Sequence, residues 1–264
     1  ALHLVLVLGY WAWVQRWFPD LSWSKTSFDK ELFKKMLWYG IPSMFSGGAI
    51  VLLTRVDTQI ITVVIGVSAV ALYENAFAFA AIQNMIARPL NKYQFPRMTK
   101  YDENGRHEEK QQLFTSIQRF SIVAFGAFAL VSTVGAESLL TVLFSSTYRD
   151  AAPYLILLTY GFLFNGLAST ILSALSAHGY QTTRMYLLYS AAAINLGGSI
   201  IGAYAFGLAG VAWTSVITFF ALWALCAYVV VRKTDLSYPL PMVFKALSVI
   251  AVMLAAGLLT KGLV

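Results

Sequence analysis

The sequence predicts an all-α integral membrane protein, a polytopic bundle of transmembrane helices with about eight hydrophobic segments. Hydrophobic residues make up 58% of the 264 residues and charged residues only 12%. An ordinary soluble domain has roughly 45–50% apolar and about 25% charged residues, so this chain has too few charges to cover a water-facing surface. Its basic residues lie between long charge-free runs, and one bilayer crossing needs about 20 apolar residues.

The first three segments come from the N-terminal third of the chain. The first covers residues 1–15, and the second covers 36–54 with an uncharged continuation through 58–73. The third runs from about residue 70 to 90. Between the first two, residues 24–39 place apolar side chains on one helical face and lysines elsewhere, which predicts an interfacial helix leading into the second span.

The later segments contain fewer charged residues. The fourth covers 120–136 and the fifth about 151–177. Residues 185–231 form an uncharged run of 47 residues, more than twice a crossing, so this run must fold back, with Gly207–Gly210 as the turn. The eighth segment extends from about 243 to 260.

The distribution of basic residues predicts the orientation. Sixteen of the 19 lysines and arginines lie in four alternate loops, residues 15–35, 88–119, 178–184 and 232–245. Because cytoplasmic loops are enriched in Lys and Arg, we expect these loops to face the cytoplasm. The expected organisation is the end of one transmembrane helix plus the interfacial helix (1–35), a six-helix lobe (36–233) and a further, truncated helix (234–264). We therefore expect the chain to be a piece of a longer protein.

Several function classes are disfavoured. The net charge of +7 follows from membrane topology, so no nucleic-acid partner is expected. Cys226 is the single cysteine and the three histidines are far apart, so neither a disulfide framework nor a metal-ligand spacing is present. No phosphate loop, GxSxG or HExxH motif occurs. We expect neither an enzyme nor a resident cofactor or metal.

Four ionisable residues fall inside predicted spans: Arg55, Asp57, Glu74 and Arg88. Each costs about 2.5–3.5 kcal/mol on insertion scales, so such groups are candidates for a ligand site or pathway. Arg55 shares a helical face with Gln59, whereas Asp57 lies about 200° around from Arg55 at 100° per residue. Either the helix is irregular there or Asp57 meets another helix. For Arg55 the alternative is a structural pair with an acid on a neighbouring helix.

A polar stripe is predicted along the third span, and it implies a water-filled cavity between the second and third spans. Its members fall within an arc of about 100° and are Glu74, Ala81, Asn84, Arg88 and Asn91. Arg88 has the alternative of snorkelling to lipid headgroups. In the fifth and sixth spans, small and polar residues recur at the spacing of close helix packing. Within these ridges Asn165 and Asn195 are the members we expect to touch a polar substrate.

Several landmarks occur in a recognisable order: Gly40-Ile41-Pro42, Asp57-x-x-Ile60-Ile61, Ala71-Leu72-Tyr73, Arg88-Pro89, Asn195 and Gly207-Leu208-Ala209-Gly210. In this order the chain resembles the polysaccharide and O-antigen flippases of the multidrug, oligosaccharidyl-lipid and polysaccharide exporter superfamily. The resemblance implies the second six-helix lobe of a two-lobe exporter, with the first lobe absent from this chain.

The resemblance also implies a function: alternating-access translocation of a lipid-linked oligosaccharide across the inner (cytoplasmic) membrane for surface polysaccharide or O-antigen synthesis. The substrate-binding residues implied are Arg55, Asp57, Gln59, Glu74, Asn84, Arg88, Asn165 and Asn195. The arginines would hold the pyrophosphate, while Glu74 or Asp57 would couple a Na⁺ or H⁺ ion. The expected partners are membrane lipid, the lipid-linked oligosaccharide, the missing lobe and glycan-assembly proteins.

Three alternatives remain open. The same fold exports cationic drugs or the peptidoglycan precursor in sister families. A membrane glycan polymerase or glycosyltransferase would need acidic motifs or a large outer loop, and the longest outer loop, 135–150, offers only Glu137, Arg149 and Asp150. A non-transporting scaffold would require that every intramembrane charge is structural.

Overall fold

The computed structural model describes residues 2–17, 29–245 and 248, and apart from short turns this part of the chain is helical, without a strand. The elements are α1 (Leu2–Trp17), α2 (Lys30–Val64), α3 (Val67–Ala80), α4 (Gln83–Glu103), α5 (His107–Leu143), the 3₁₀ helix η2 (Ser146–Ala151), α6 (Ala152–Ala177) and α7 (Gln181–Lys233). Among the described residues, four helical stretches are long and apolar enough to cross a membrane: Lys30–Val64, His107–Leu143, Ser146–Ala177 and Gln181–Lys233. The predicted all-α polytopic bundle is confirmed.

The described chain divides into two compact units, Ala1–Ile41 and Pro42–Val264. The first unit holds α1 and the beginning of α2. Asp29 caps α2, because its Oδ1 accepts the backbone N–H groups of Glu31 and Leu32 at 2.8 and 3.1 Å. The predicted interfacial helix is therefore not a separate element after residue 30, since α2 continues into the predicted second span. Its first residues lie outside the described part.

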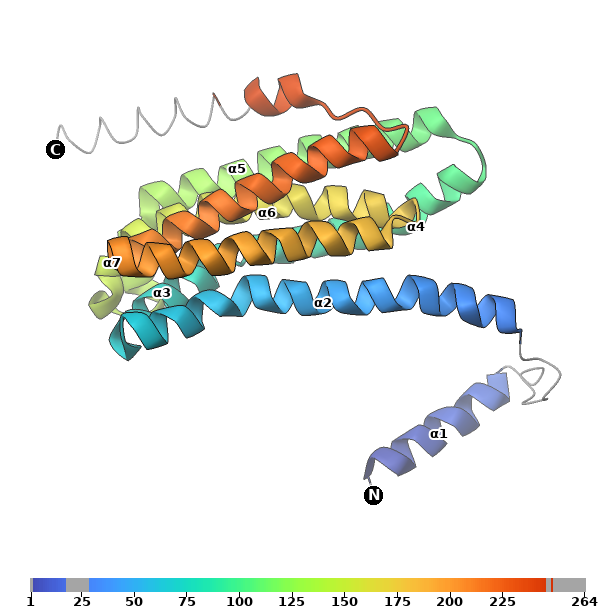
Figure 1. The fold of residues 1–264 in the computed structure, drawn as a ribbon, viewed down its shortest axis with the longest axis horizontal. Helices are drawn as coiled ribbons and strands as arrows, with labels where there is room; N and C mark the ends of the chain where they lie inside the picture. The colour runs from blue at the N-terminus through green and yellow to red at the C-terminus, as the bar shows by residue number, and fades with distance from the viewer. Residues whose placement is uncertain (1, 18–28, 246–247, 249–264) are drawn as a thin grey trace. The chain divides into compact units, whose positions relative to one another are not determined.

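The second unit is built around α6, which packs against α3, α4, α5 and α7 (Figure 1). Most α6 residues are buried, and many of them are small. At Gly166 an added Cβ would lie 2.5 Å from the Phe125 ring, so the ring of α5 rests directly on the backbone of α6. Inside a membrane such close packing, rather than exclusion of water, holds helices together.

The longest helix, α7, is a hairpin. Gly207 has φ 60° and ψ −141°, which interrupts the 53-residue stretch, and Figure 1 shows the two arms running back along each other. Behind the turn the arms almost touch: a Cβ added at Gly210 would lie 2.1 Å from the Gly202 carbonyl oxygen. The predicted fold-back at Gly207–Gly210 is confirmed.

The predicted third span is wrong as a single helix. The turn near residue 67 exists, with Gly66 at φ 121°, but a second break separates α3 from α4. At this break the Ile82 and Asn84 N–H groups bond to carbonyls three residues back, those of Phe79 and Ala81. No Gly or Pro marks the site. The buried Gln83 side chain instead donates to the Thr159 carbonyl of α6 at 2.8 Å, which anchors the start of α4 on that helix.

The other segments follow the prediction with different bounds. The first forms α1, of 16 residues, and the fourth and fifth lie within α5 and α6. Most of the eighth lies outside the described residues. Three of the loops expected on the cytoplasmic side meet at one end of the second unit, since Lys110 of α5 and His178 after α6 both lie against Asp102 and Asp235. Their common location supports the alternation of loops on which the orientation rests.

Candidate functional site

Asp57 of α2 is the most deeply buried acid of the candidate site, with 2% of its surface exposed. Its Oδ1 accepts hydrogen bonds from the Asn195 amide and the Ser199 hydroxyl, both at 2.8 Å. Its Oδ2 accepts from the Tyr73 and Ser215 hydroxyls, also at 2.8 Å. The carboxylate therefore joins α2, α3 and both arms of α7.

Local helix geometry explains why these side chains converge. Asn195 and Ser199 are four residues apart and share one face of the first arm of α7. The reversal at Gly207 brings Ser215 of the second arm alongside that face. The turn at Gly66 returns the chain so that Tyr73 of α3 reaches Asp57, 16 residues earlier. The sequence left two possibilities open for Asp57, an irregular helix or a contact with another helix. The structure shows that Asp57 contacts other helices.

The four donors to Asp57 are all neutral. The ion pairs found among the described residues involve other carboxylates. Burying an uncompensated charge costs several kcal/mol even after relaxation, so this carboxylate is stable either as the neutral acid or with a cation beside it. The four donors solvate the anion without neutralising its charge.

One further oxygen is available next to the carboxylate. The side-chain Oδ1 of Asn195 is buried and has no hydrogen-bond partner, while the Nδ2 of the same amide is committed to Asp57. Buried polar atoms without partners are uncommon in native proteins. Together with the carboxylate and the three hydroxyls, this atom makes an all-oxygen set, the donor type that hard cations prefer.

Glu74 lies one residue after Tyr73 but makes a separate contact. It accepts a hydrogen bond from the Thr58 hydroxyl of α2. Thr58 and Asp57 are neighbours, so α2 presents two consecutive polar side chains to α3. This second carboxylate is only partly buried.

Arg55, Gln59 and Thr62 occupy a different face of α2, and all three are exposed. The ion pair weighed as the alternative for Arg55 is not found among the described residues. Arg88 of α4 is exposed as well. The structure thus separates Asp57, which is buried, from the exposed Arg55 and Gln59 of α2 and the exposed Arg88 of α4.

The asparagines of α4 point toward α6. The Nδ2 of Asn165 donates to Asn84 at 3.4 Å, and Asn91 donates to Ser169 at 2.7 Å. The predicted stripe is therefore divided: Glu74 contacts α2, whereas Asn84 and Asn91 bridge α4 and α6. The reason is the helix break at Ala81 and Ile82, which places Glu74 on α3 and the two asparagines on α4, so that they do not share one continuous helical face.

Sequence reasoning missed three members of the Asp57 site. Ser199 lies in the sixth span, where recurring small and polar residues predict close helix packing; Tyr73 is only part of a landmark, and Ser215 has no predicted role. The available signal was the spacing of four between Asn195 and Ser199, which places two donors on one face opposite an intramembrane acid.

Comparison with known proteins assigns the family. The family model described as "polysaccharide biosynthesis protein" matches residues 2–153, more than half of the chain. The chain belongs to the polysaccharide biosynthesis protein family. The matched region holds Asp57, Tyr73 and Glu74, while Asn195, Ser199 and Ser215 of this family member lie beyond it.

Relatives and structural neighbours agree with a membrane fold. An uncharacterized membrane protein of Methanocaldococcus jannaschii is 25% identical over 84% of this chain and 44% of its own length. The MATE transporter VcmN of Vibrio cholerae in its bent form superposes with a TM-score of 0.72 at 19% identity, over 88% of this chain and 55% of that one. A MOP superfamily transporter of Pyrococcus furiosus gives 0.66 at 16% identity, over 85% and 52%. The family member described here thus spans about half the length of the proteins it matches, and it shares their fold.

Proposed function

We propose that this chain is one lobe, the C-terminal one, of a flippase that moves a lipid-linked oligosaccharide across the cytoplasmic membrane for surface polysaccharide synthesis, and that Asp57 takes up the coupling ion. The observation that carries the proposal is a buried carboxylate with four neutral donors and, among the described residues, no cationic partner, in a chain of the polysaccharide biosynthesis protein family. An ion-driven transporter needs such a site, where the charge state changes during the cycle.

The Asp57 site links ion uptake to helix position. With Na⁺ or H⁺ bound, the carboxylate is neutralised and α2, α3 and the α7 hairpin stay together around it. With the ion released, a bare carboxylate remains at 2% exposure, which is costly. Admitting water between α2 and the hairpin relieves this cost, so ion release favours a second arrangement of α2. A two-state element of this kind is what alternating access requires.

The exposed face of α2 supplies the substrate contact. Arg55 lies two residues from Asp57 on the other side of the same helix, with Gln59 one turn later. A guanidinium binds phosphate oxygens through paired, charge-assisted hydrogen bonds, so Arg55 holds the pyrophosphate. Arg88, Asn84 and Asn165 contribute further along the path. This face of α2 forms one wall of a cavity only when the other lobe lies opposite it. The chain therefore requires that lobe as a partner.

The test uses a deletion strain carrying the full-length protein. Arg55→Ala is expected to abolish surface glycan at matched expression, because the substrate loses its anchoring cation. Lys92→Ala, an exposed cation on α4, is the control and is expected to leave the glycan intact. Normal glycan with Arg55→Ala removes Arg55 from the mechanism. Unchanged glycan but increased drug sensitivity on deletion of the gene assigns the cargo to the sister class of drug exporters.

A further inference from the structure

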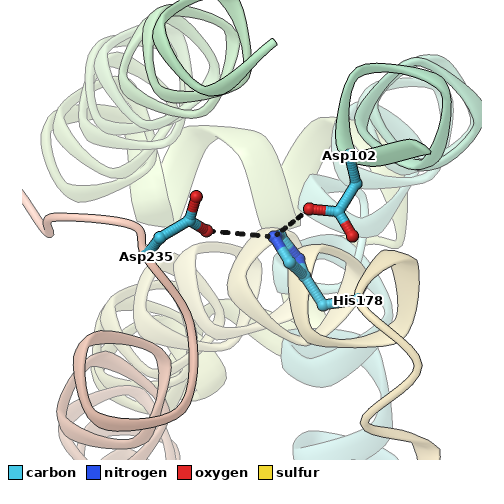
Figure 2. Close-up of side chains that lie close together, drawn as sticks. All are labelled: Asp102, His178 and Asp235. Atoms are coloured by element: carbon cyan, nitrogen blue, oxygen red, sulfur yellow. Dashed lines mark ion pairs between the residues drawn. The ribbon is translucent and has the colours of Figure 1, made fainter. Parts of the chain in front are cut away.

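A charge cluster centred on Lys110 lies at the end of the second unit far from the α7 turn. The Lys110 side chain is 1% exposed, and its Nζ lies 2.5 Å from Asp102 Oδ1 and 2.8 Å from Asp235 Oδ1. Figure 2 shows His178 directed at the same two carboxylates, with Nε2 3.6 Å from each of these oxygens. The cluster joins the end of α4, the start of α5, the end of α6 and the segment after α7.

The three residues of Figure 2 have the composition of a metal site, since their ligand atoms lie within 4.8 Å of one another. Lys110 argues against a metal ion. Its ammonium bonds the same two oxygens that a metal would need, at distances that leave no room for a second cation. The chain therefore supplies the cation of this cluster itself.

Asp235 begins a segment that is docked along α5. The next residues make a reciprocal pair: the Ser237 N–H donates to Gln111 Oε1 at 2.8 Å, and Gln111 Nε2 donates to the Ser237 carbonyl at 3.0 Å. Tyr238 accepts a hydrogen bond from Trp223 Nε1 at 2.8 Å and packs against Phe114.

Apolar burial completes the docking. Leu236 is 2% exposed and Val243 is fully buried, both within the main apolar cluster of the unit. We call residues 234–243 the strap. Within ten residues the strap makes an ion pair, two backbone hydrogen bonds with Gln111 and buried apolar contacts. It is therefore attached to the helices at several points and is not a loose linker.

The two carboxylates of the cluster differ from the lysine in their access to water. Asp102 and Asp235 keep 39% and 42% of their side-chain area exposed. Burial by itself raises the pKa of Asp235, but hydrogen bonds from Lys110 and His107 outweigh it and hold the pKa at about 2. The Asp235 carboxylate is therefore ionised at neutral pH. Because it is partly exposed, its ion pair with Lys110 can open without leaving the carboxylate buried and unpaired.

We propose that the ion pairs of Lys110 with Asp102 and Asp235 form a releasable lock that holds the strap on α5 and so fixes the cytoplasmic ends of α4, α5 and α6 to the segment that follows α7. Without the Lys110 charge, two carboxylates face each other within 4.8 Å and repel. The strap then detaches while the bundle above it stays folded. The proposal does not depend on ion binding at Asp57.

Hydrogen exchange of the purified full-length protein tests the lock. In Lys110→Met, backbone exchange across 235–240 is expected to rise at least about 10-fold, because hydrogen bonds to charged groups are among the stronger ones. Lys100→Met, an exposed lysine of α4, is the matched control and is expected to leave exchange unchanged. Lys110→Arg keeps the charge and should retain most of the protection. Exchange across 185–203 reports whether the bundle has folded.

Three outcomes would overturn the proposal. One is equal exchange of 235–240 in Lys110→Met and Lys100→Met. The second is a rise across 185–203 as large as that of the strap, which would make Lys110 a general folding residue. The third is slower strap exchange on adding Zn²⁺ to the wild type, which would show that a metal ion and not Lys110 closes the cluster.

Discussion

Asp57 remains in the core of a membrane protein because neighbouring helices bring four hydroxyl and amide donors to it. Each donor stabilises the anion without cancelling its charge, so the residue stays available to a mobile cation. A lysine or arginine in place of any of these donors would form a permanent ion pair with the Asp57 carboxylate. The neutrality of the donors is therefore the chemical feature that separates an ion site from a structural ion pair.

Removing one donor tests this description at the residue scale. Tyr73→Phe keeps the ring but loses the 2.8 Å hydrogen bond to Asp57. Since hydrogen bonds to charged groups contribute about 1.5–3 kcal/mol, the thermal stability of the full-length protein should fall at a pH where Asp57 is ionised. Tyr204→Phe, at an exposed position, is the control. Equal melting temperatures for the two variants would argue that the Tyr73 contact has no energetic role.

Asp235 gives a pH dependence at the opposite end of the bundle. Its pKa is about 2, below the ordinary value of 3.8, so its stabilising contribution is complete above about pH 4 and is lost as the pH falls through 2. The titratable groups facing it are Lys110, His107, His178 and Asp102. We expect the wild type to be more stable than Asp235→Asn at pH 5 and the difference to shrink between pH 4 and 2. A difference that stays constant over this window contradicts the assignment.

Sequence reasoning reached Asp57 and Asn195 but not the other three residues of the site. The intramembrane cost of charge identified Asp57 and Arg55, and helical geometry correctly placed them on different faces of α2. The partners of Asp57 come from helices 16 to 158 residues away in the chain, and periodicity within one helix carries no information about that pairing. Ser215 in particular is indistinguishable from a packing serine in the sequence.

At the scale of elements, the α7 hairpin depends on two glycines in contact. A Cβ at Gly210 would lie 2.1 Å from the Gly202 carbonyl, so Gly210→Ala must push the arms apart, at an expected cost of about 1–3 kcal/mol. Gly197→Ala on the same helix meets nothing within 4 Å and should be neutral or slightly stabilising. Thermal unfolding distinguishes the two variants, and equal stability would show that the arms are not closely packed.

The elements differ in how well their bounds could be predicted. The reversal in α7 was predictable because 47 uncharged residues exceed two crossings and Gly207-Leu208-Ala209-Gly210 lies at their middle. The break between α3 and α4 was not, since it occurs in a run of alanines and is stabilised by the tertiary hydrogen bond of Gln83 to α6. Tertiary contacts decide such breaks, and local sequence does not encode them.

At the scale of the whole molecule, the chain spans about half the length of the proteins whose fold it shares. Its second unit has its own core around α6, and it holds both the buried Asp57 site and the Lys110 cluster. The Asp57 site joins α2, α3 and α7, whereas the Lys110 cluster joins α4, α5, α6 and the segment after α7. In the proposed flippase, ion binding sets the position of α2 while the strap keeps the far ends of α4, α5 and α6 together, so the lobe moves as a unit.

Titration of the purified full-length protein with NaCl tests most directly whether Asp57 takes up the coupling cation. Choline chloride controls for ionic strength, and the pH change is recorded in weak buffer. We expect saturable Na⁺ binding by the wild type, or reversible proton uptake if the coupling ion is H⁺, and loss of that signal in Asp57→Asn. Equal Na⁺ binding and equal proton uptake by the wild type and Asp57→Asn would contradict the account.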